Sequence, residues 1–178
     1  MIERYTRPEM GRIWDLQNKY EKWLEVEILA CEAHAKKRRI PRDALERIKK
    51  KARFDVKRIR EIEKTVKHDV IAFLTNVGEA IGEDSAFLHM GLTSSDILDT
   101  GMALQIRDAS EIIRKDLKRL HKVLRSQALK YRDTVQIGRS HGIHAEPTTF
   151  GMKLALWYEE VGRDIQRFER AVETISCG

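Results

Sequence analysis

Apolar residues recur at intervals of three and four positions along most of this chain, the spacing that places side chains on one face of a helix. One series runs from Tyr20 to Ala35, and two longer ones predict helices over residues 96–131 and from about Pro147 onwards. The positions expected to be buried are Tyr20, Trp23, Leu24, Ile28, Cys31 and Ala35, then Ile113, Leu117, Leu120, Leu124, Ala128 and Tyr131, and finally Leu154, Tyr158, Val161, Ile165, Phe168, Val172 and Ile175.

Capping and breaking residues separate the shorter helices. The sequence from Thr6 to Glu9 matches a capping box, and Asp55 is expected to cap a further helix. An apolar run that begins at Val70 is expected to end at Gly82, and residues 82–95 read as a loop. No stretch of alternating residues is long enough to predict a strand.

The pattern therefore predicts an all-α chain with two domains. A small helical domain is expected over residues 1–93, and residues 94–178 are expected to form the first, incomplete part of an elongated bundle of long helices. The last apolar series resembles a coiled-coil seam, which needs partner helices alongside it. Two such helices cannot cover their own apolar surfaces, so we expect further chain or further subunits to do so.

Composition favours a soluble cytoplasmic protein. Of the 178 residues, 42% are hydrophobic and 35% are charged, while only two Asn and five Gln occur, a balance typical of heat-stable proteins. Cys31 and Cys177 form no disulfide framework or metal-binding spacing, and we expect both thiols to be reduced. Neither a signal peptide nor a membrane-spanning run is recognisable, so no membrane partner is expected.

The net charge of +6 is concentrated in one segment. Residues Lys36 to Lys67 contain fifteen Lys or Arg and five Asp or Glu. This segment is compatible with binding nucleic acid, with steering an anionic small substrate, or with a solvated helix face. Phe54 is its only aromatic residue, which argues against nucleic acid because bases have little to stack on.

Two clusters of polar residues lie at predicted helix starts. Lys67, His68 and Asp69 place a cation, an imidazole and a carboxylate together, although Asp69 is also a natural N-cap beside an incidental His68. In the second cluster, Thr93 and Ser94 precede a long helix, whose free N–H groups and dipole favour an anion. The alternative for that cluster is capping by Ser95 or Asp96.

A third cluster, residues 138–151, places His141 and His144 in a segment rich in turn-forming residues. Histidine exchanges protons near neutral pH, although these two side chains are also compatible with a purely turn-shaping role. No further Cys or His stands nearby, so no metal site is predicted, and no nucleotide or dinucleotide loop occurs. Near the start of the chain, Arg4 and Tyr5, beside Arg7, would suit a phosphate, although N-terminal arginines are usually just solvated.

Taken in order, the segments 67–73, 91–100 and 139–151 closely resemble the adenylosuccinate lyases of the fumarase/aspartase superfamily, in their N-terminal portion. The resemblance implies β-elimination of adenylosuccinate to AMP and fumarate, and the same cleavage of a succinyl-carboxamide ribotide, without a cofactor. It implies that His141 is the general acid and that His68 orients the substrate. The residues implied to bind substrate are Arg4, Tyr5, Lys67, Asp69, Thr93 and Ser94.

The resemblance also implies what this chain lacks. Family members are homotetramers with active sites shared between subunits, and their catalytic base is a serine on a downstream glycine- and serine-rich loop. No such loop occurs in these 178 residues, so we expect the isolated chain to be inactive. Two alternatives are a related enzyme such as a carboxymuconate cycloisomerase and a non-catalytic helical assembly module.

Overall fold

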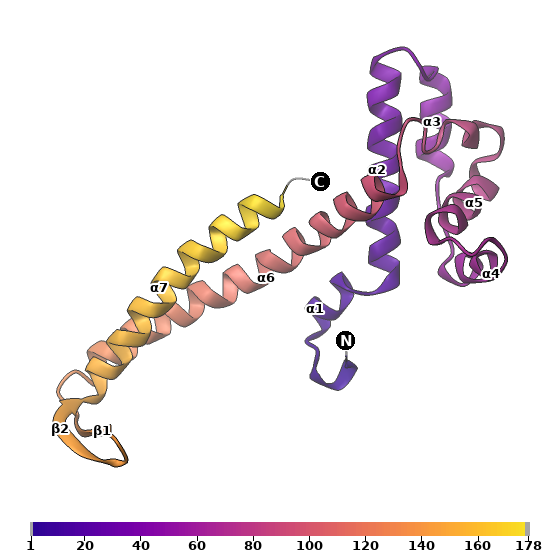
Figure 1. Ribbon diagram of the computed structural model, residues 1–178. Coiled ribbons are helices and arrows are strands. Elements are labelled where there is room, and N and C mark those ends of the chain that lie inside the picture. Colours follow the sequence, from indigo (N-terminus) through magenta and orange to yellow (C-terminus); the bar gives the residue numbers. More distant parts are fainter. Residues whose placement is uncertain (1, 177–178) are drawn as a thin grey trace. The chain divides into compact units, whose positions relative to one another are not determined.

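The computed structural model describes residues 2–176, which are mainly helical (Figure 1). The chain forms two compact units, one of residues up to Asp108 together with Ser176, and one of Ala109–Ile175. Helix α6 (Ser94–Lys130) belongs to both units. The predicted all-α class is confirmed, with one small two-stranded sheet in the described part. The expected domain boundary lies at the start of α6, whereas the compact units divide within that helix.

The first unit is built from short and medium helices around an aromatic centre. Its core includes Tyr20 and Trp23 of α2, Ile59 of α4 and Phe73 of α5, all at most 3% exposed. The rings of Tyr20 and Phe73 stack with centroids 5.6 Å apart. The elements are η1 (Glu3–Tyr5), α1 (Pro8–Ile13), α2 (Leu16–Lys36), α3 (Arg42–Lys51), α4 (Val56–Val66), α5 (Asp69–Ile81), η2 (Gly82–Phe87) and the first part of α6.

The first part of α6 is held closely against α2 within this unit. A Cβ on Gly101 would lie 2.8 Å from Cδ1 of Trp23, so only glycine allows this approach. The Gln105 side chain donates a hydrogen bond to the Ile13 carbonyl at 2.7 Å, and Lys22 pairs with Asp108 at 2.8 Å. These contacts fix the start of α6, where Thr93 and Ser94 lie.

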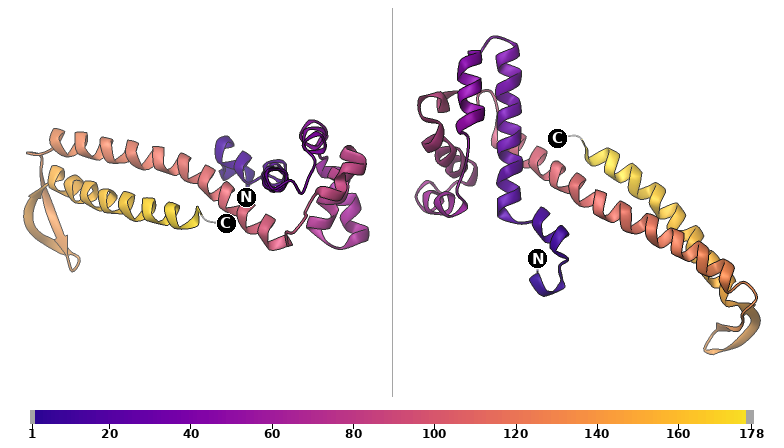
Figure 2. Two further views of the ribbon diagram at one scale, coloured as in Figure 1. Left: turned by 90° about the horizontal axis from the view of Figure 1, so that it is seen from above. Right: turned by 180° about the vertical axis from the view of Figure 1, so that it is seen from behind.

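The second unit consists of two antiparallel helices and a hairpin. The remainder of α6 runs beside α7 (Phe150–Ile175) in every view, and the hairpin of β1 (Val135–Ser140) and β2 (Ile143–Thr149) joins them at one end (Figures 1 and 2). The Arg114 guanidinium on α6 binds both carboxylate oxygens of Glu169 on α7 at 2.8–3.0 Å. The rings of His121 and Tyr158 stack at 3.9 Å.

The prediction that no strand occurs is wrong for this hairpin. Ser140 pairs with Ile143, so His141 and Gly142 form a two-residue turn with φ values of 50° and 76°. Positive φ at both central residues is what the tightest hairpin turns require. Pro147, expected near the start of the last helix, instead lies in β2 opposite Ile137, and α7 begins three residues later.

The long apolar stripes are only partly buried within the described residues. Leu124, Leu154 and Val172 are buried, as predicted, but Ile113 is 40% exposed and Leu120 is 46% exposed. The stripe prediction is therefore wrong in the isolated chain for these two positions and for Ile175, which is 37% exposed. Helix periodicity identified the correct face, but a single pair of helices covers only a narrow seam of that face.

The predicted caps have mixed outcomes. Asp55 accepts a hydrogen bond from the Arg58 amide at 2.8 Å, and Gly82 ends α5 with φ of 81°, so both predictions are confirmed. The capping box at Thr6 is wrong, because Arg7 is the N-cap of α1 and the Thr6 hydroxyl instead donates to the Ile2 carbonyl at 2.7 Å. The predicted loop over residues 82–95 contains the 3-10 helix η2.

Candidate active site

Lys67, His68 and Asp69 form the junction between α4 and α5. Lys67 ends α4 in the left-handed conformation, with φ of 54°. His68 is the N-cap of α5, and its Nδ1 accepts a long hydrogen bond of 3.4 Å from the Ile71 amide. Because Nδ1 acts as an acceptor there, a neutral His68 ring carries its hydrogen on Nε2. This leaves a donor at the outer edge of an exposed imidazole.

Asp69 does not cap α5 as expected. It is the first residue of the helix, and its Oδ1 accepts a hydrogen bond from the Val70 amide at 2.8 Å. The same oxygen lies 3.7 Å from Nδ1 of His68, so the two side chains are neighbours. The reading of His68 as incidental is therefore wrong, because His68 performs the capping that was assigned to Asp69.

Thr93 and Ser94 lie at the start of α6. The Thr93 amide donates to the Asp96 carboxylate at 2.7 Å, and the helix begins at Ser94, so neither Ser95 nor Asp96 is its N-cap. The amides of Ser94 and Ser95 belong to the first turn of α6, where backbone donors have no partner within the helix. First-turn amides of a helix face outward with the positive end of the dipole. The site therefore presents free donors to an anion.

His141 occupies the tip of the hairpin, where its side chain is exposed. A non-glycine residue with φ of 50° is held in a conformation that L-residues avoid, at a cost of about 1 kcal/mol. His144 lies in β2, paired in register with Arg139, and is also exposed. The sequence therefore correctly placed His141 in a turn, and nothing in the described part of the second unit buries its ring.

Arg4 and Tyr5 lie in η1 and are both exposed, with the guanidinium carbon 4.8 Å from the centre of the tyrosine ring. Within the described part of the first unit, no hydrogen bond or ion pair joins this pair to the 67–69 junction or to Thr93 and Ser94. His141 belongs to the second compact unit. The contacts that the structure provides among the predicted site residues are thus local to each segment.

One pair of functional candidates was missed by the sequence analysis. The Glu27 carboxylate on α2 is 1% exposed, and its two oxygens lie 2.8 Å from the amide and 2.7 Å from Nδ1 of His89. His89 has φ of 60° and lies five residues before Ser94. The sequence did contain a signal for this pair. Glu27 is a lone Glu on the buried face of the series from Tyr20 to Ala35, and a buried carboxylate needs a partner.

The basic segment is partly neutralised by nearby acids. Arg47 binds Asp84 through two hydrogen bonds of 2.7 and 2.9 Å, Lys49 binds Glu32 at 2.8 Å, and Arg58 binds Glu79 at 2.6 Å. The hydrogen bonds from Arg47 hold the pKa of the Asp84 carboxyl below its usual range. The segment is thus tied into α2, α5 and η2 through acids of the same unit.

Cys31 is buried, and burial raises the pKa of its thiol to about 11 with a smaller contribution from Glu27, so it is an inert side chain. Cys177 lies outside the described residues.

In the part of the chain that the structure describes, no group of three His, Cys, Asp or Glu residues is arranged to hold a metal ion. None of the described helices is long and apolar enough to cross a membrane.

The sequence model of a family described as lyase matches residues 3–178. The chain belongs to this lyase family. Among curated members, an adenylosuccinate lyase from Staphylococcus saprophyticus is 51% identical over all 178 residues, and one from Bacillus subtilis is 48% identical over the same length. The chain spans 41% of the length of both relatives.

Solved structures of other lyase-family relatives have the same fold. A fumarate lyase from Mesorhizobium sp. BNC1 is 30% identical with a TM-score of 0.88, and a 3-carboxy-cis,cis-muconate lactonizing enzyme from Pseudomonas putida is 32% identical with a TM-score of 0.86. Each comparison covers 93% of this chain and 40% of the other. The resemblance that the three motifs indicated is confirmed at the level of the family and the fold.

Proposed function

We propose that this chain supplies the general-acid side of an active site that cleaves adenylosuccinate to AMP and fumarate by β-elimination, and that it also acts on the related succinyl-carboxamide ribotide. The observation that carries the proposal is 51% and 48% identity, over every residue of the chain, to two adenylosuccinate lyases. The exposed position of His141 at a hairpin tip supports its role as a proton donor.

The chemistry requires an acid and an anion site. Removal of a proton beside a carboxylate increases the negative charge on that carboxylate, and fixed donors lower this cost by several kcal/mol. The first-turn amides of Ser94 and Ser95 and the hydroxyls of Thr93 and Ser94 are suitable donors for the succinyl carboxylate. His141 then protonates the departing nitrogen, a step for which a positioned acid typically contributes about 10²–10⁴-fold.

The remaining candidates are assigned to binding. His68, an exposed ring whose Nδ1 lies beside Asp69, orients the substrate, and Lys67 and Asp69 complete that contact set. Arg4 and Tyr5 bind the phosphate, because a guanidinium and a phenol hydroxyl both donate hydrogen bonds to phosphate oxygens. The reaction proceeds without a cofactor or metal in this proposal.

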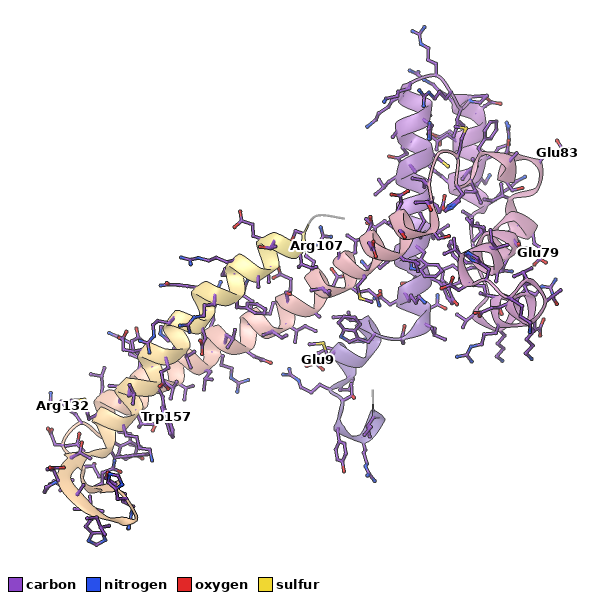
Figure 3. All side chains as sticks on the ribbon, in the orientation of Figure 1. Glu9, Glu79, Glu83, Arg107, Arg132 and Trp157 are labelled. Carbon is purple, nitrogen blue, oxygen red and sulfur yellow. The ribbon has the colours of Figure 1, made fainter. Side chains whose placement is uncertain are left out.

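The proposed enzyme is a cytoplasmic homotetramer with shared active sites, in which the catalytic base comes from sequence beyond these 178 residues. Exposed apolar residues on the second unit support association: Leu129 is 61% exposed, Leu156 is 56% exposed and Trp157, labelled on α7 in Figure 3, is 42% exposed. We further propose the two-domain division at residues 93 and 94 and raised heat stability. Solution molecular weight and a melting curve test these points.

The direct test is a hybrid enzyme. The matched segment of the Bacillus subtilis adenylosuccinate lyase is replaced by this chain, and fumarate release from adenylosuccinate is measured. The proposal predicts turnover by the hybrid and none by the isolated 178-residue chain. A folded, tetrameric hybrid without activity would contradict the proposal, and fumarate release by the isolated chain would contradict the division of the active site.

A related lyase acting on a muconate-type substrate is the second candidate. It is favoured by the high TM-score with the Pseudomonas putida lactonizing enzyme, although the identity there is 32%. Replacing the matched segment of that enzyme instead of the Bacillus subtilis one discriminates the two candidates. The second candidate predicts that only the lactonizing hybrid is active.

A further inference from the structure

One face of α2 holds the segment that leads into α6. Glu27, Cys31 and His34 lie one and two helical turns apart on α2. The Cys31 thiol contacts the Phe87 carbonyl at 3.6 Å, and Nε2 of His34 lies 2.8 Å from the Met90 carbonyl. Together with the contacts of Glu27 to His89, these interactions attach residues 87–90 to α2 at three successive points.

The contact between Glu27 and His89 differs from the other two because it places a carboxylate in the interior. Glu27 is 1% exposed, and burying a carboxylate costs free energy unless both oxygens find donors. His89 supplies both, one from its backbone amide and one from its ring. A carboxylate only accepts hydrogen bonds, so Nδ1 of His89 carries the hydrogen and a neutral ring leaves Nε2 without one.

The same pair also fixes an unfavourable backbone. His89 has φ of 60°, a conformation that persists in a non-glycine residue only where the surroundings enforce it. Gly91, with φ of 76°, turns the chain again two residues later. The path of the backbone from His89 to Thr93 is therefore set by the contact with Glu27 rather than by local preference.

We propose that Glu27 is a positioning residue, which fixes the backbone and the ring tautomer of His89 and thereby the placement of Thr93 and Ser94 at the start of α6. An alternative role, plain support of the core, would be served as well by an apolar residue that avoids the cost of a buried charge. The effect on catalysis rests on the proposed function, whereas the effect on His89 does not.

The first measurement is the tautomer of His89 in the 178-residue chain, by nitrogen-15 NMR of the imidazole, with its signals assigned by comparison with His89→Gln. The proposal predicts hydrogen on Nδ1 in the unmodified chain, and a neutral ring with its hydrogen on Nε2 alone would overturn it. In Glu27→Gln the amide group cannot accept from both donors, so we expect the His89 signals to change. Glu32→Gln, which changes a half-buried carboxylate of the same helix that pairs with Lys49 and not with His89, is the control and leaves them unchanged.

The second measurement is made in the hybrid enzyme. Glu27→Gln is expected to raise KM for adenylosuccinate about tenfold or more, while Glu27→Asp, which keeps both acceptor oxygens, recovers part of the loss. Cys31→Ala reports the effect of weakening the same helix face without changing Glu27, and its KM should stay near that of the unmodified hybrid.

An unchanged KM in Glu27→Gln, in an active hybrid, would overturn the inference but not the proposed function. An inactive unmodified hybrid would contradict the proposed function, and the tautomer of His89 would still decide the inference.

Discussion

Lys67 and His68 share one helix boundary: Lys67 ends α4, with its amide donating to the Glu63 carbonyl at 2.8 Å, and His68 immediately begins α5 as its N-cap. Only these two residues separate the helices, so the backbone must turn sharply at Lys67, which has φ of 54°. Glycine is the usual residue at such a helix end. A lysine there is strained, and the proposed role in binding substrate provides a reason to retain it.

Lys67→Gly is therefore expected to stabilise the chain by about 0.5–1 kcal/mol, because glycine adopts a positive φ without strain. In the hybrid enzyme the same change is expected to raise KM, since it removes the cation that we propose binds the substrate. Arg38, which has φ of 58° after α2, is the matched control. Arg38→Gly should stabilise the fold similarly and leave KM unchanged, and an equal rise in KM for both variants would contradict the role of Lys67.

The close packing between the start of α7 and the end of α6 gives a prediction about stability. A Cβ on Gly151 would lie 2.5 Å from the Arg132 Cα and 2.6 Å from the Ala128 carbonyl oxygen, both of which are backbone atoms. Gly151→Ala is expected to destabilise the second unit by about 1–3 kcal/mol or more, measured by chemical denaturation.

Gly162→Ala is the control for this prediction. Its Cβ would lie 3.2 Å from Nε2 of His121, a side chain that can shift slightly. Alanine also favours a helix interior by about 1 kcal/mol over glycine, so this change should be neutral or stabilising. Equal stability of the two variants would mean that α6 and α7 do not meet as closely as the structure shows.

Periodicity and capping rules predicted most of the helices but not the hairpin. Tyr20, Trp23, Cys31 and Ala35 lie on the buried face of α2 as expected, because a long amphipathic helix has only one way to bury its apolar face. The strands were missed because their alternating pattern is short. The turn at His141 also requires a positive φ that nothing in its residue type reveals.

The local elements that carry the candidate site residues were predictable from the sequence, and the contacts between distant residues were not. Helix starts at His68 and Ser94 follow from local sequence, whereas the contact between Glu27 and His89 joins residues 62 positions apart. Pairing over that distance depends on how α2 packs against the loop before α6. Periodicity cannot supply that information, because it reports only the face on which a residue lies.

The ion pair between Arg114 and Glu169 predicts a pH dependence of stability in the second unit. Hydrogen bonds from Arg114 lower the pKa of the Glu169 carboxyl. A lowered folded-state pKa contributes stability above the unfolded-state value of about 4.3, and this stability is lost as pH falls through the lower folded value. Glu169→Gln should therefore unfold at a lower temperature than the unmodified chain at pH 7, and the difference should disappear once the pH has fallen below the lowered folded-state pKa of Glu169. Glu173→Gln, an exposed change on the same helix, should show no such difference at either pH.

Cys31 should be unreactive in the folded chain. With a pKa raised to about 11 and 1% exposure, about one thiol in a thousand is ionised at pH 8, and reagents cannot reach it. In a Cys177→Ser background, alkylation at pH 8 should therefore proceed only as the chain unfolds. Because folding raises the pKa of the Cys31 thiol, the contribution of this thiol to the free energy of unfolding is complete below about pH 9. It falls as pH rises towards 11. Rapid labelling under native conditions would contradict the buried position of Cys31.

The most direct measurement of the central claim is the rate of fumarate release by the hybrid enzyme carrying His141→Asn, compared with His144→Asn. Asparagine tolerates a positive φ, so the first change preserves the hairpin turn and removes only the proton donor. The account predicts that turnover falls about 10²–10⁴-fold in His141→Asn, with unfolding unaltered, and stays within about threefold in His144→Asn. Full turnover in His141→Asn would contradict the account.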